Sequence, residues 1–248
     1  MAETAVLGRI TWLTASVAGD VRETPRVRTL DLDVPSWAGH RAGQHLDVRL
    51  TAEDGYQAER SYSIASAPED ELAISVERLE DGEVSAYLVD EAREGDRFEL
   101  RGPIGGYFVW DAEDERPLFL VGGGSGVAPL MSMIRHRVRS GSEAPVRLLY
   151  SSRSYEEVIY RDELEKLSGR DGIDIFHTLT RSQPEGWTGY SRRIDDDLLH
   201  EVAWPASGEA RVFVCGSTHF VDAAADGLVR LGYEPIRIRT ERFGATGN

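Results

Sequence analysis

The chain has 248 residues, of which 41% are hydrophobic and 29% are charged, and these ordinary globular values exclude a disordered, collagen-like or disulfide-framework protein. At about 100–200 residues per domain, the length is compatible with one large domain and fits two better. A formal net charge of −15 excludes nucleic acid as a favourable partner, because a phosphate backbone repels an acidic surface. The single cysteine, Cys215, can form no internal disulfide and cannot supply the four thiolates of an iron–sulfur cluster.

The N-terminus carries an early acid, Glu3, and no basic region ahead of an apolar run, a pattern that does not predict a signal peptide. No apolar run approaches the roughly 20 residues of a membrane-spanning helix. We therefore expect a soluble, cytoplasmic protein with no membrane partner. Charge is uneven, with a net −11 over residues 1–112 and −4 over residues 113–248, so the second half offers the milder field to an anionic ligand.

From Arg9 to about Leu100 the sequence predicts short strands at roughly ten-residue spacing, separated by turn residues. Hydrophobic and polar residues alternate in several of these stretches. The predicted strands are Val27–Val34, Leu46–Leu50, Ala58–Ser66, Leu72–Glu77 and Arg97–Leu100, with one helix at Val84–Ala92. This pattern is typical of an antiparallel barrel or sandwich.

After Trp110 and the acidic segment 111–117, buried strand runs alternate with helical stretches. The predicted strands are Leu118–Val121, Val146–Tyr150, Ile173–Leu179 and Val212–Cys215, and the helices that follow them are 129–140, 155–167, 194–203 and 218–231. Such alternation predicts a parallel, doubly wound sheet. We therefore predict two domains, residues 1–112 and 113–248.

In the first half, the strand Glu59–Ile64 places Arg60 and Tyr62 on one face. It is followed by Gly82-Glu-Val-Ser85 at a helix start and by the glycine-rich loop Arg101–Phe108. An arginine and a helix N-terminus can neutralise a diphosphate, and an aromatic ring can stack on a flat heterocycle. Glycines let that heterocycle lie close to the backbone.

A glycine turn, Gly122-Gly-Gly-Ser-Gly-Val-Ala-Pro129, lies between the first apolar strand of the second half and a helix. At such a turn the backbone can approach a pyrophosphate, and the helix N-terminus supplies unpaired N–H donors. Its pattern, Gly124-x-Gly126-x-x-Pro129, lacks the usual third glycine, while Pro129 suits the first turn of a helix. The turn predicts a dinucleotide site, and a glycine turn without a ligand is the alternative.

The end of the next strand bears on which dinucleotide binds. An NAD site commonly has a carboxylate there for the ribose 2′-hydroxyl, whereas this strand ends in Ser152 and Arg153. Arg181 and Arg193 follow the next strand and could close the same pocket. Because a 2′-phosphate needs donors and cations, these residues favour NADPH, with NADH as the alternative.

Four ordered motifs, Arg60-x-Tyr62-Ser63, Gly82-x-x-Ser85, Gly124-x-Gly126-x-x-Pro129 and Cys215-Gly216, make the chain resemble the ferredoxin–NADP⁺ reductase superfamily of flavoproteins. Within that superfamily it most resembles stand-alone bacterial ferredoxin reductases related to the reductase components of oxygenases. The resemblance runs from about residue 5 to the last helix. It implies an antiparallel Greek-key β-barrel that binds flavin, followed by an α/β nucleotide-binding domain with a parallel sheet.

The resemblance also implies roles for individual residues. Arg60 would contact the flavin phosphates, Tyr62 would stack on the isoalloxazine, and Ser63 would hydrogen-bond near its N5. The remaining cofactor-binding positions that we predict are Ile64, the diphosphate-binding Gly82, Val84 and Ser85, and Gly216 beside Cys215. The diphosphate motif favours FAD over FMN.

At the transfer site itself, the resemblance implies that Cys215 lies beside the nicotinamide C4 and that Glu241 and Phe243 complete the wall. Phe243 would cover the flavin until nicotinamide displaces it, although here it is followed by Gly-Ala-Thr-Gly-Asn. A second departure from the family is Ser217, which stands where proline commonly follows Cys-Gly. The six histidines show neither metal-ligand spacing nor a triad pattern, and we assign them no chemistry and predict no metal site.

The predicted reaction is hydride transfer from NADPH to FAD, followed by single-electron transfer to a separate carrier. The leading acceptor is a ferredoxin or similar small carrier that serves a cytochrome P450 or another oxygenase, docked against basic residues such as Arg22, Arg26 and Arg28. A direct NAD(P)H diaphorase or flavin reductase is the alternative enzyme. A flavin-free nucleotide-binding subunit is the alternative that is not an enzyme.

Overall fold

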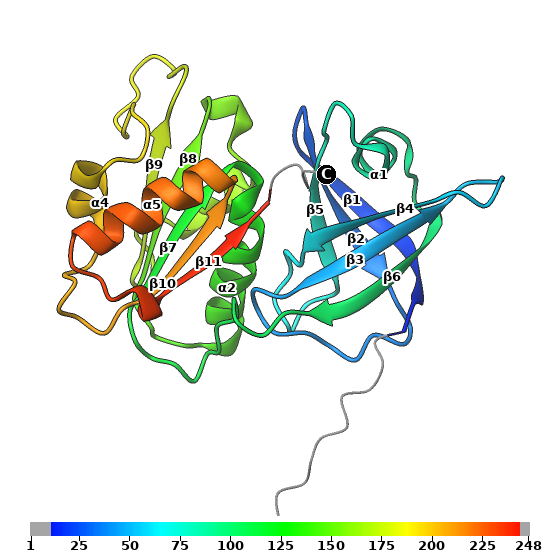
Figure 1. The fold of residues 1–248 in the computed structure, drawn as a ribbon, viewed down its shortest axis with the longest axis horizontal. Helices are drawn as coiled ribbons and strands as arrows, with labels where there is room; N and C mark the ends of the chain where they lie inside the picture. Colours follow the sequence, from blue (N-terminus) through cyan, green and yellow to red (C-terminus); the bar gives the residue numbers. More distant parts are fainter. Residues whose placement is uncertain (1–10, 244–248) are drawn as a thin grey trace, which may run out of the picture.

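The computed structural model describes residues 11–243, which form two units side by side, an all-β unit and an α/β unit (Figure 1). The all-β unit contains β1 (Leu13–Thr24), β2 (Val27–Asp33), β3 (His45–Thr51), β4 (Gln57–Ser63), β5 (Ala73–Glu77) and β6 (Arg97–Ile104). Its strand order is β4-β3-β6-β1-β2-β5, and all neighbours are antiparallel. A bridge between Ile64 and Ile74 joins the two edges, so the sheet closes into a barrel.

The barrel closes around alternating apolar side chains, as the hydrophobic pattern predicts. Leu30, Leu46, Ile74 and Leu100 come from four different strands and are fully buried in one cluster. The helix predicted at Val84–Ala92 is α1 (Glu83–Ala86) followed by a wider π turn, Tyr87–Glu91. In that turn the Ala92 N–H donates to the Tyr87 carbonyl five residues earlier, at 2.9 Å.

The α/β unit contains a parallel sheet of β7 (Leu118–Gly123), β8 (Val146–Ser152), β9 (Ile173–Leu179), β10 (Arg211–Gly216) and β11 (Ile238–Arg242). The strand order is β11-β10-β7-β8-β9. Its helices are α2 (Val127–Ser140), α3 (Arg161–Leu167), α4 (Asp196–Val202) and α5 (Thr218–Arg230), and α4 and α5 cover the near face in Figure 1. Two buried clusters, one on each face of the sheet, confirm the doubly wound prediction.

Two strands and one helix differ from the sequence expectations. β1 and β11 were not among the predicted strands. The helix predicted at 155–167 is wrong as one element, because the structure has a single 3-10 turn at Tyr155–Glu157 and then α3. Between them Tyr160 adopts a left-handed φ of 57° and turns its buried side chain toward the barrel.

The two units share a core and a chain of hydrogen bonds. Phe108 and Trp110, which follow the barrel, are buried in the same cluster as Met133 of α2. The Tyr160 hydroxyl bonds the Ser75 hydroxyl, which lies 2.7 Å from Thr29 Oγ1.

That chain of hydrogen bonds closes on Glu23. Thr29 Oγ1 donates to Glu23 Oε1 at 2.8 Å, and the Tyr160 N–H donates to Glu23 Oε2 at 3.2 Å. The predicted boundary at residues 112 and 113 falls in the connection between β6 and β7 and stays a prediction. Within residues 11–243, no helix is both long enough and apolar enough to cross a bilayer.

Candidate functional site

β7 and β10 lie side by side at the centre of the parallel sheet. We call the position beyond their carboxyl ends, beside the glycine turn and Gly216, the crevice, after the ligand position of doubly wound folds. From β7 the next strands in the chain, β8 and β9, lie toward one edge of the sheet, whereas from β10 the next strand, β11, lies toward the other edge. The loops after β7 and β10 therefore leave on opposite faces of the sheet. Ligands of doubly wound folds bind at such a switch point, beside the carboxyl ends of the strands. The glycine turn follows β7 and Cys215-Gly216 ends β10, so the structure brings these two predicted motifs together at the switch point.

The glycine turn is shaped by close packing against the end of β10. A Cβ on Gly126 would lie 2.2 Å from the Cys215 carbonyl oxygen, and Gly124 has a left-handed φ of 56°. Both positions therefore require glycine. The turn leads into α2, whose first turn contains Pro129. The first N–H groups of a helix have no partner within the helix, so those of α2 lie unpaired next to the glycine turn. Glycine backbone and a helix N-terminus fit a diphosphate group.

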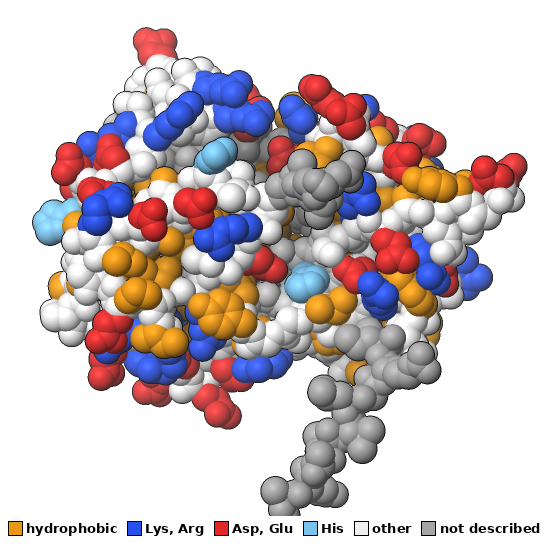
Figure 2. All heavy atoms as spheres, in the orientation of Figure 1, with side chains coloured by type: hydrophobic (Ala, Val, Ile, Leu, Met, Phe, Trp, Pro, Cys, Tyr) orange, Lys and Arg blue, Asp and Glu red, His pale blue; other side chains and the backbone are white. Residues whose placement is uncertain are grey.

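The predicted 2′-phosphate residues lie along the ends of β8 and β9. The Arg181 N–H donates to the Arg153 carbonyl at 2.9 Å, which joins the two loops, and both side chains are exposed. Arg193 is also exposed, whereas Ser152 is buried and its hydroxyl has no hydrogen-bond partner within residues 11–243. Basic side chains gather over the loops after β8 and β9 in Figure 2.

The residues predicted to bind the flavin diphosphate lie in the all-β unit, around β4 and α1. Arg60 is exposed, and its guanidinium bonds only the neighbouring Glu59 carbonyl, at 2.6 Å, among the contacts of residues 11–243. The Ser85 hydroxyl donates to the Gly82 carbonyl and accepts from the Leu79 N–H, both at 3.1 Å. Arg60 is therefore free to meet a phosphate, whereas Ser85 shapes the turn.

The residues predicted to face the isoalloxazine lie on β4, which pairs with β3. Tyr62 is opposite Leu46 and Ser63 is opposite His45. Burial raises the pKa of the Tyr62 hydroxyl, which is therefore neutral and suited to stacking. Ile64 and Val84 are buried in the barrel core, so only their backbone could face a cofactor.

The third group of residues joins the two units beside the crevice. Glu241 of β11 is the direct neighbour of Cys215 of β10, and Glu241 Oε1 lies 3.5 Å from His45 Nδ1 of β3. Burial raises the pKa of Glu241 to about 7 and lowers the pKa of His45. Both shifts favour neutral forms, so the contact is better described as a neutral carboxyl–imidazole pair than as an ion pair.

Cys215 is fully buried, and burial, followed by the Glu241 carboxyl, raises the pKa of its thiol well above the usual range. A protonated, enclosed thiol is a small packing group and not a nucleophile. Glu241 Oε2 is buried with no hydrogen-bond partner among residues 11–243, so those residues leave one carboxyl oxygen unsatisfied. Such an orphaned atom fits a site that a polar ligand group completes.

Phe243 extends from β11 past the end of β10. Its N–H donates to the Gly216 carbonyl at 3.0 Å, and its partly buried ring packs on the cluster that contains Cys215. The predicted covering of the flavin by this ring stays a prediction. The Gly-Ala-Thr-Gly-Asn segment after Phe243 lies outside the described residues.

Sequence reasoning missed His45, to which it gave no role. Its alternating strand showed only a half-buried position, and its contact with Glu241 joins opposite ends of the chain. No sequence signal short of the full fold places these two residues together.

Of Arg22, Arg26 and Arg28, suggested as a basic docking patch, the structure makes Arg28 unavailable to a partner. Arg28 is buried, and its guanidinium binds Asp20 and the carbonyls of two residues after α1. Arg22 donates to the Val89 carbonyl and Arg26 to the Arg78 carbonyl. Sequence shows charge and not burial, so it could not separate the buried Arg28 from Arg22, which is exposed, and Arg26, which is half-buried.

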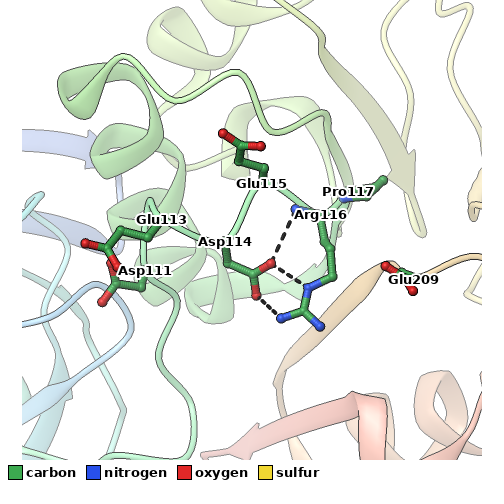
Figure 3. Close-up of a pocket in the computed structure, with 7 residues that line it drawn as sticks. All are labelled: Asp111, Glu113, Asp114, Glu115, Arg116, Pro117 and Glu209. Atoms are coloured by element: carbon green, nitrogen blue, oxygen red, sulfur yellow. Dashed lines mark hydrogen bonds and ion pairs between the residues drawn. The ribbon is translucent and has the colours of Figure 1, made fainter.

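A shallow hollow of about 750 Å³ lies away from the crevice, where the connection between the units meets the start of β7 (Figure 3). Its lining is acidic, comprising Asp111, Glu113, Asp114, Glu115 and Glu209 with Arg116 and Pro117. Asp114 turns toward Arg116, and although burial alone would raise the pKa of Asp114, hydrogen bonds from Arg116 and Arg211 lower it to about 2. Residues 111–117 precede β7 and Glu209 precedes β10, so the hollow lies at the amino ends of these strands. The predicted nucleotide-binding turn lies at their carboxyl ends.

Comparison with known proteins agrees with this arrangement. The family described as "Oxidoreductase FAD-binding domain" matches residues 16–109, and "Oxidoreductase NAD-binding domain" matches residues 120–226. The chain is 36% identical to ferredoxin–NADP reductase B of Sorangium cellulosum over 210 residues, which cover 82% of this chain and 84% of that protein. The chain belongs to the ferredoxin–NADP⁺ reductase superfamily. Its barrel is the FAD-binding domain, and its α/β unit is the NAD(P)-binding domain.

A second relative of this flavoprotein is a glycine betaine monooxygenase reductase subunit of Pseudomonas aeruginosa, 32% identical over 232 residues. The match covers 91% of this chain but only 63% of that protein, so the chain spans a little under two thirds of such relatives. Two solved structures share the fold. They are the FAD/NAD-binding domain of nitric oxide dioxygenase from Vibrio cholerae (TM-score 0.83, 24% identity, 94% of this chain and 98% of that chain) and a ferredoxin NADP⁺ reductase from Neisseria gonorrhoeae with FAD and NADP bound (TM-score 0.79, 23% identity, 93% and 98%).

Proposed function

We propose that the protein is an NADPH-preferring, FAD-dependent reductase that delivers electrons singly to a separate small carrier, a ferredoxin in the first instance. The observation that carries the proposal is the meeting of the two domains at the crevice. The strand pair that holds Tyr62 and Ser63 meets the Cys215–Glu241 strand pair through one side-chain contact, in which His45 Nδ1 lies 3.5 Å from Glu241 Oε1. This contact supports one site shared by the residues predicted to face the flavin and those predicted to face the nicotinamide.

Bound FAD would supply the chemistry, because it accepts one hydride, which carries two electrons, and releases those electrons one at a time. The chain's own task is to bring two flat rings together and keep water out. Tyr62 offers a neutral ring on the barrel side, and Cys215 offers a small, closed packing surface on the other side. Glu241, whose pKa burial raises to about 7, and His45, whose pKa burial lowers, can hold or pass a proton at the site's edge.

The exposed arginines after β8 and β9 support NADPH as the donor. Arg153 and Arg181 have joined backbones, and neither side chain takes part in an ion pair within residues 11–243. Replacing both with alanine should raise the KM for NADPH about tenfold or more and leave the KM for NADH nearly unchanged. Arg170→Ala, at an exposed turn before the opposite end of β9, is the matched control. Equal effects on the two donors would contradict the assignment.

The acceptor is proposed from the relatives and from the sequence. Relatives of this chain include an oxygenase reductase subunit and a ferredoxin–NADP reductase, and these 248 residues contain one cysteine. An iron–sulfur centre must therefore come from outside them. Turnover with ferredoxin should exceed turnover with free flavin by a large factor, and an oxygenase such as a cytochrome P450 would then consume the electrons.

One observation favours a second candidate, a diaphorase or flavin reductase that needs no protein partner. The barrel half carries a net charge of −11, and Arg22, Arg26 and Arg28 are engaged in internal hydrogen bonds. An acidic ferredoxin would find little attraction on that side. Faster turnover with free flavin than with any ferredoxin would select this candidate.

Anaerobic mixing of the purified protein with NADPH or NADH tests both enzyme candidates together. The flavin absorbance should bleach within the turnover time, and it should bleach faster with NADPH. A colourless protein that binds nucleotide without any flavin absorbance would instead support the non-enzymatic alternative and overturn the proposal.

A further inference from the structure

A hydrogen bond crosses between the domains at the dinucleotide turn. Ser125, the middle residue of Gly124–Gly126, donates its hydroxyl to Glu77 Oε2 at 2.8 Å. Glu77 is the last residue of β5 and therefore belongs to the FAD-binding domain. Ser125 is the only residue of the Gly124–Gly126 turn with a side-chain hydrogen-bond donor, and the carboxylate of Glu77 from the other domain accepts that hydrogen bond.

The negative charge of Glu77 is not neutralised nearby. No arginine, lysine or histidine within residues 11–243 forms an ion pair with it, although the next residue, Arg78, pairs with Asp90. Glu77 also lies near the buried end of β8. Burial first, and the Glu77 carboxylate among several smaller causes, raises the pKa of Tyr150. Glu77 therefore places a carboxylate that has no ion-pair partner among residues 11–243 beside the turn that follows β7.

That charge opposes the ligand for which the turn is built. A dinucleotide diphosphate carries two negative charges, and it would seek the same backbone N–H groups and the same Ser125 hydroxyl. Like charges within a few ångströms disfavour each other even when water screens them. The diphosphate must therefore displace the Ser125–Glu77 contact and bind beside a carboxylate.

We propose that Glu77 is a built-in competitor of the dinucleotide diphosphate and thereby sets the affinity of the protein for NADP⁺ and NADPH. The contact closes the turn when no nucleotide is bound and weakens the bound state by repulsion. The inference rests on the proposed binding of the dinucleotide diphosphate at Gly124–Gly126.

Calorimetric titration of the FAD-loaded protein with NADP⁺ tests this inference without any turnover. Glu77→Gln keeps an acceptor for Ser125 and removes the charge, so the Kd for NADP⁺ should fall about three- to tenfold. Glu77→Ala should shift the Kd in the same direction. Glu71→Gln makes the same change in net charge at an exposed barrel position and should leave the Kd unchanged.

Ser125→Ala separates competition from a purely structural contact. This variant also loses the contact with Glu77 but keeps the carboxylate and loses a donor to the phosphate, so its Kd should stay equal or rise. Thermal unfolding without nucleotide provides the second readout. If the contact were only structural, Glu77→Ala and Ser125→Ala would both lower the Tm and no variant would bind NADP⁺ more tightly, which would overturn the inference.

A Kd within twofold of the wild-type value for both Glu77 variants would also overturn it. Failure of the underlying function is distinguishable. A wild-type protein that binds neither NADP⁺ nor NAD⁺ would refute the assignment of the turn, whereas a wild-type protein that binds normally beside unchanged variants would refute only the role of Glu77.

Discussion

Replacing Glu241 with glutamine removes a carboxyl group that burial keeps largely protonated up to neutral pH. Its pKa is about 7 in the folded protein against 4.5 for a free glutamate side chain. An acid whose pKa is raised by folding contributes its full stabilisation below pH 4.5, and that contribution is lost as the pH rises through 7. Above that pH the folded protein must hold an ionised carboxylate in a buried position.

The size of the effect follows from the shift. A difference of 7 − 4.5 = 2.5 pKa units corresponds to about 3 kcal/mol in the free energy of unfolding. For a protein of this length, about 1 kcal/mol moves the Tm by about 2–4 °C. The wild-type protein should therefore lose about 6–12 °C of Tm relative to Glu241→Gln between about pH 5 and pH 8.5. Near pH 5 the two proteins should have similar Tm values.

Thermal unfolding of both flavin-loaded proteins across this pH range is the assay. Glu234→Gln is the matched control, because Glu234 is exposed and paired on the surface with Arg237, and it should follow the wild-type curve. A constant Tm difference between wild type and Glu241→Gln at every pH would show that the Glu241 carboxyl is not held neutral, and it would refute the reasoning.

Three further substitutions probe other parts of the site. Gly126→Ala places a Cβ 2.2 Å from the Cys215 carbonyl oxygen and should lower the free energy of unfolding by about 1–3 kcal/mol while weakening NADP⁺ binding; denaturant unfolding and titration check both, and an unchanged protein would contradict the packing. Cys215→Leu should slow flavin reduction in stopped-flow mixing with no loss of bound flavin, and a normal rate would show that the assigned nicotinamide contact is wrong. Tyr160→Phe removes the hydroxyl that bonds Ser75 and should lower the free energy of unfolding by about 1–2 kcal/mol, whereas no loss of Tm would mean that this bond contributes nothing.

Alternation in the sequence was enough to predict most of both sheets. Ile173–Leu179 is a strand at the residues predicted, and the strand predicted at Leu46–Leu50 is one residue longer at each end in the structure. β1 was missed because Gly19 and several polar residues interrupt its pattern where the strand is bulged. β11 was missed because its sequence, Ile-Arg-Thr-Glu-Arg, is polar, and only its parallel pairing with β10 makes it a strand.

The helix predicted at 155–167 failed for a tertiary reason. The segment has helical spacing, but Tyr160 leaves the helical region to place its hydroxyl on Ser75 of the other domain. Local propensity cannot register a partner that lies far along the chain.

The candidate site divides in the same way. The glycine turn and Arg60-x-Tyr62-Ser63 could be found in the sequence because all residues of each motif lie close together in the chain. His45 beside Glu241, and Glu77 beside Ser125, join different domains, so only the folded chain reveals them.

The closed ring of Glu23, Thr29, Ser75 and Tyr160 limits how members of this superfamily can exchange parts. Three of its members belong to the barrel and one to the other domain, and removing any one of them leaves polar atoms without their partner at the interface between the domains. A chimera joined between β6 and β7 would therefore lose these hydrogen bonds unless Tyr160 and its barrel partners came from the same parent protein. Recombination within such reductases should accordingly favour donors that already agree at these four positions.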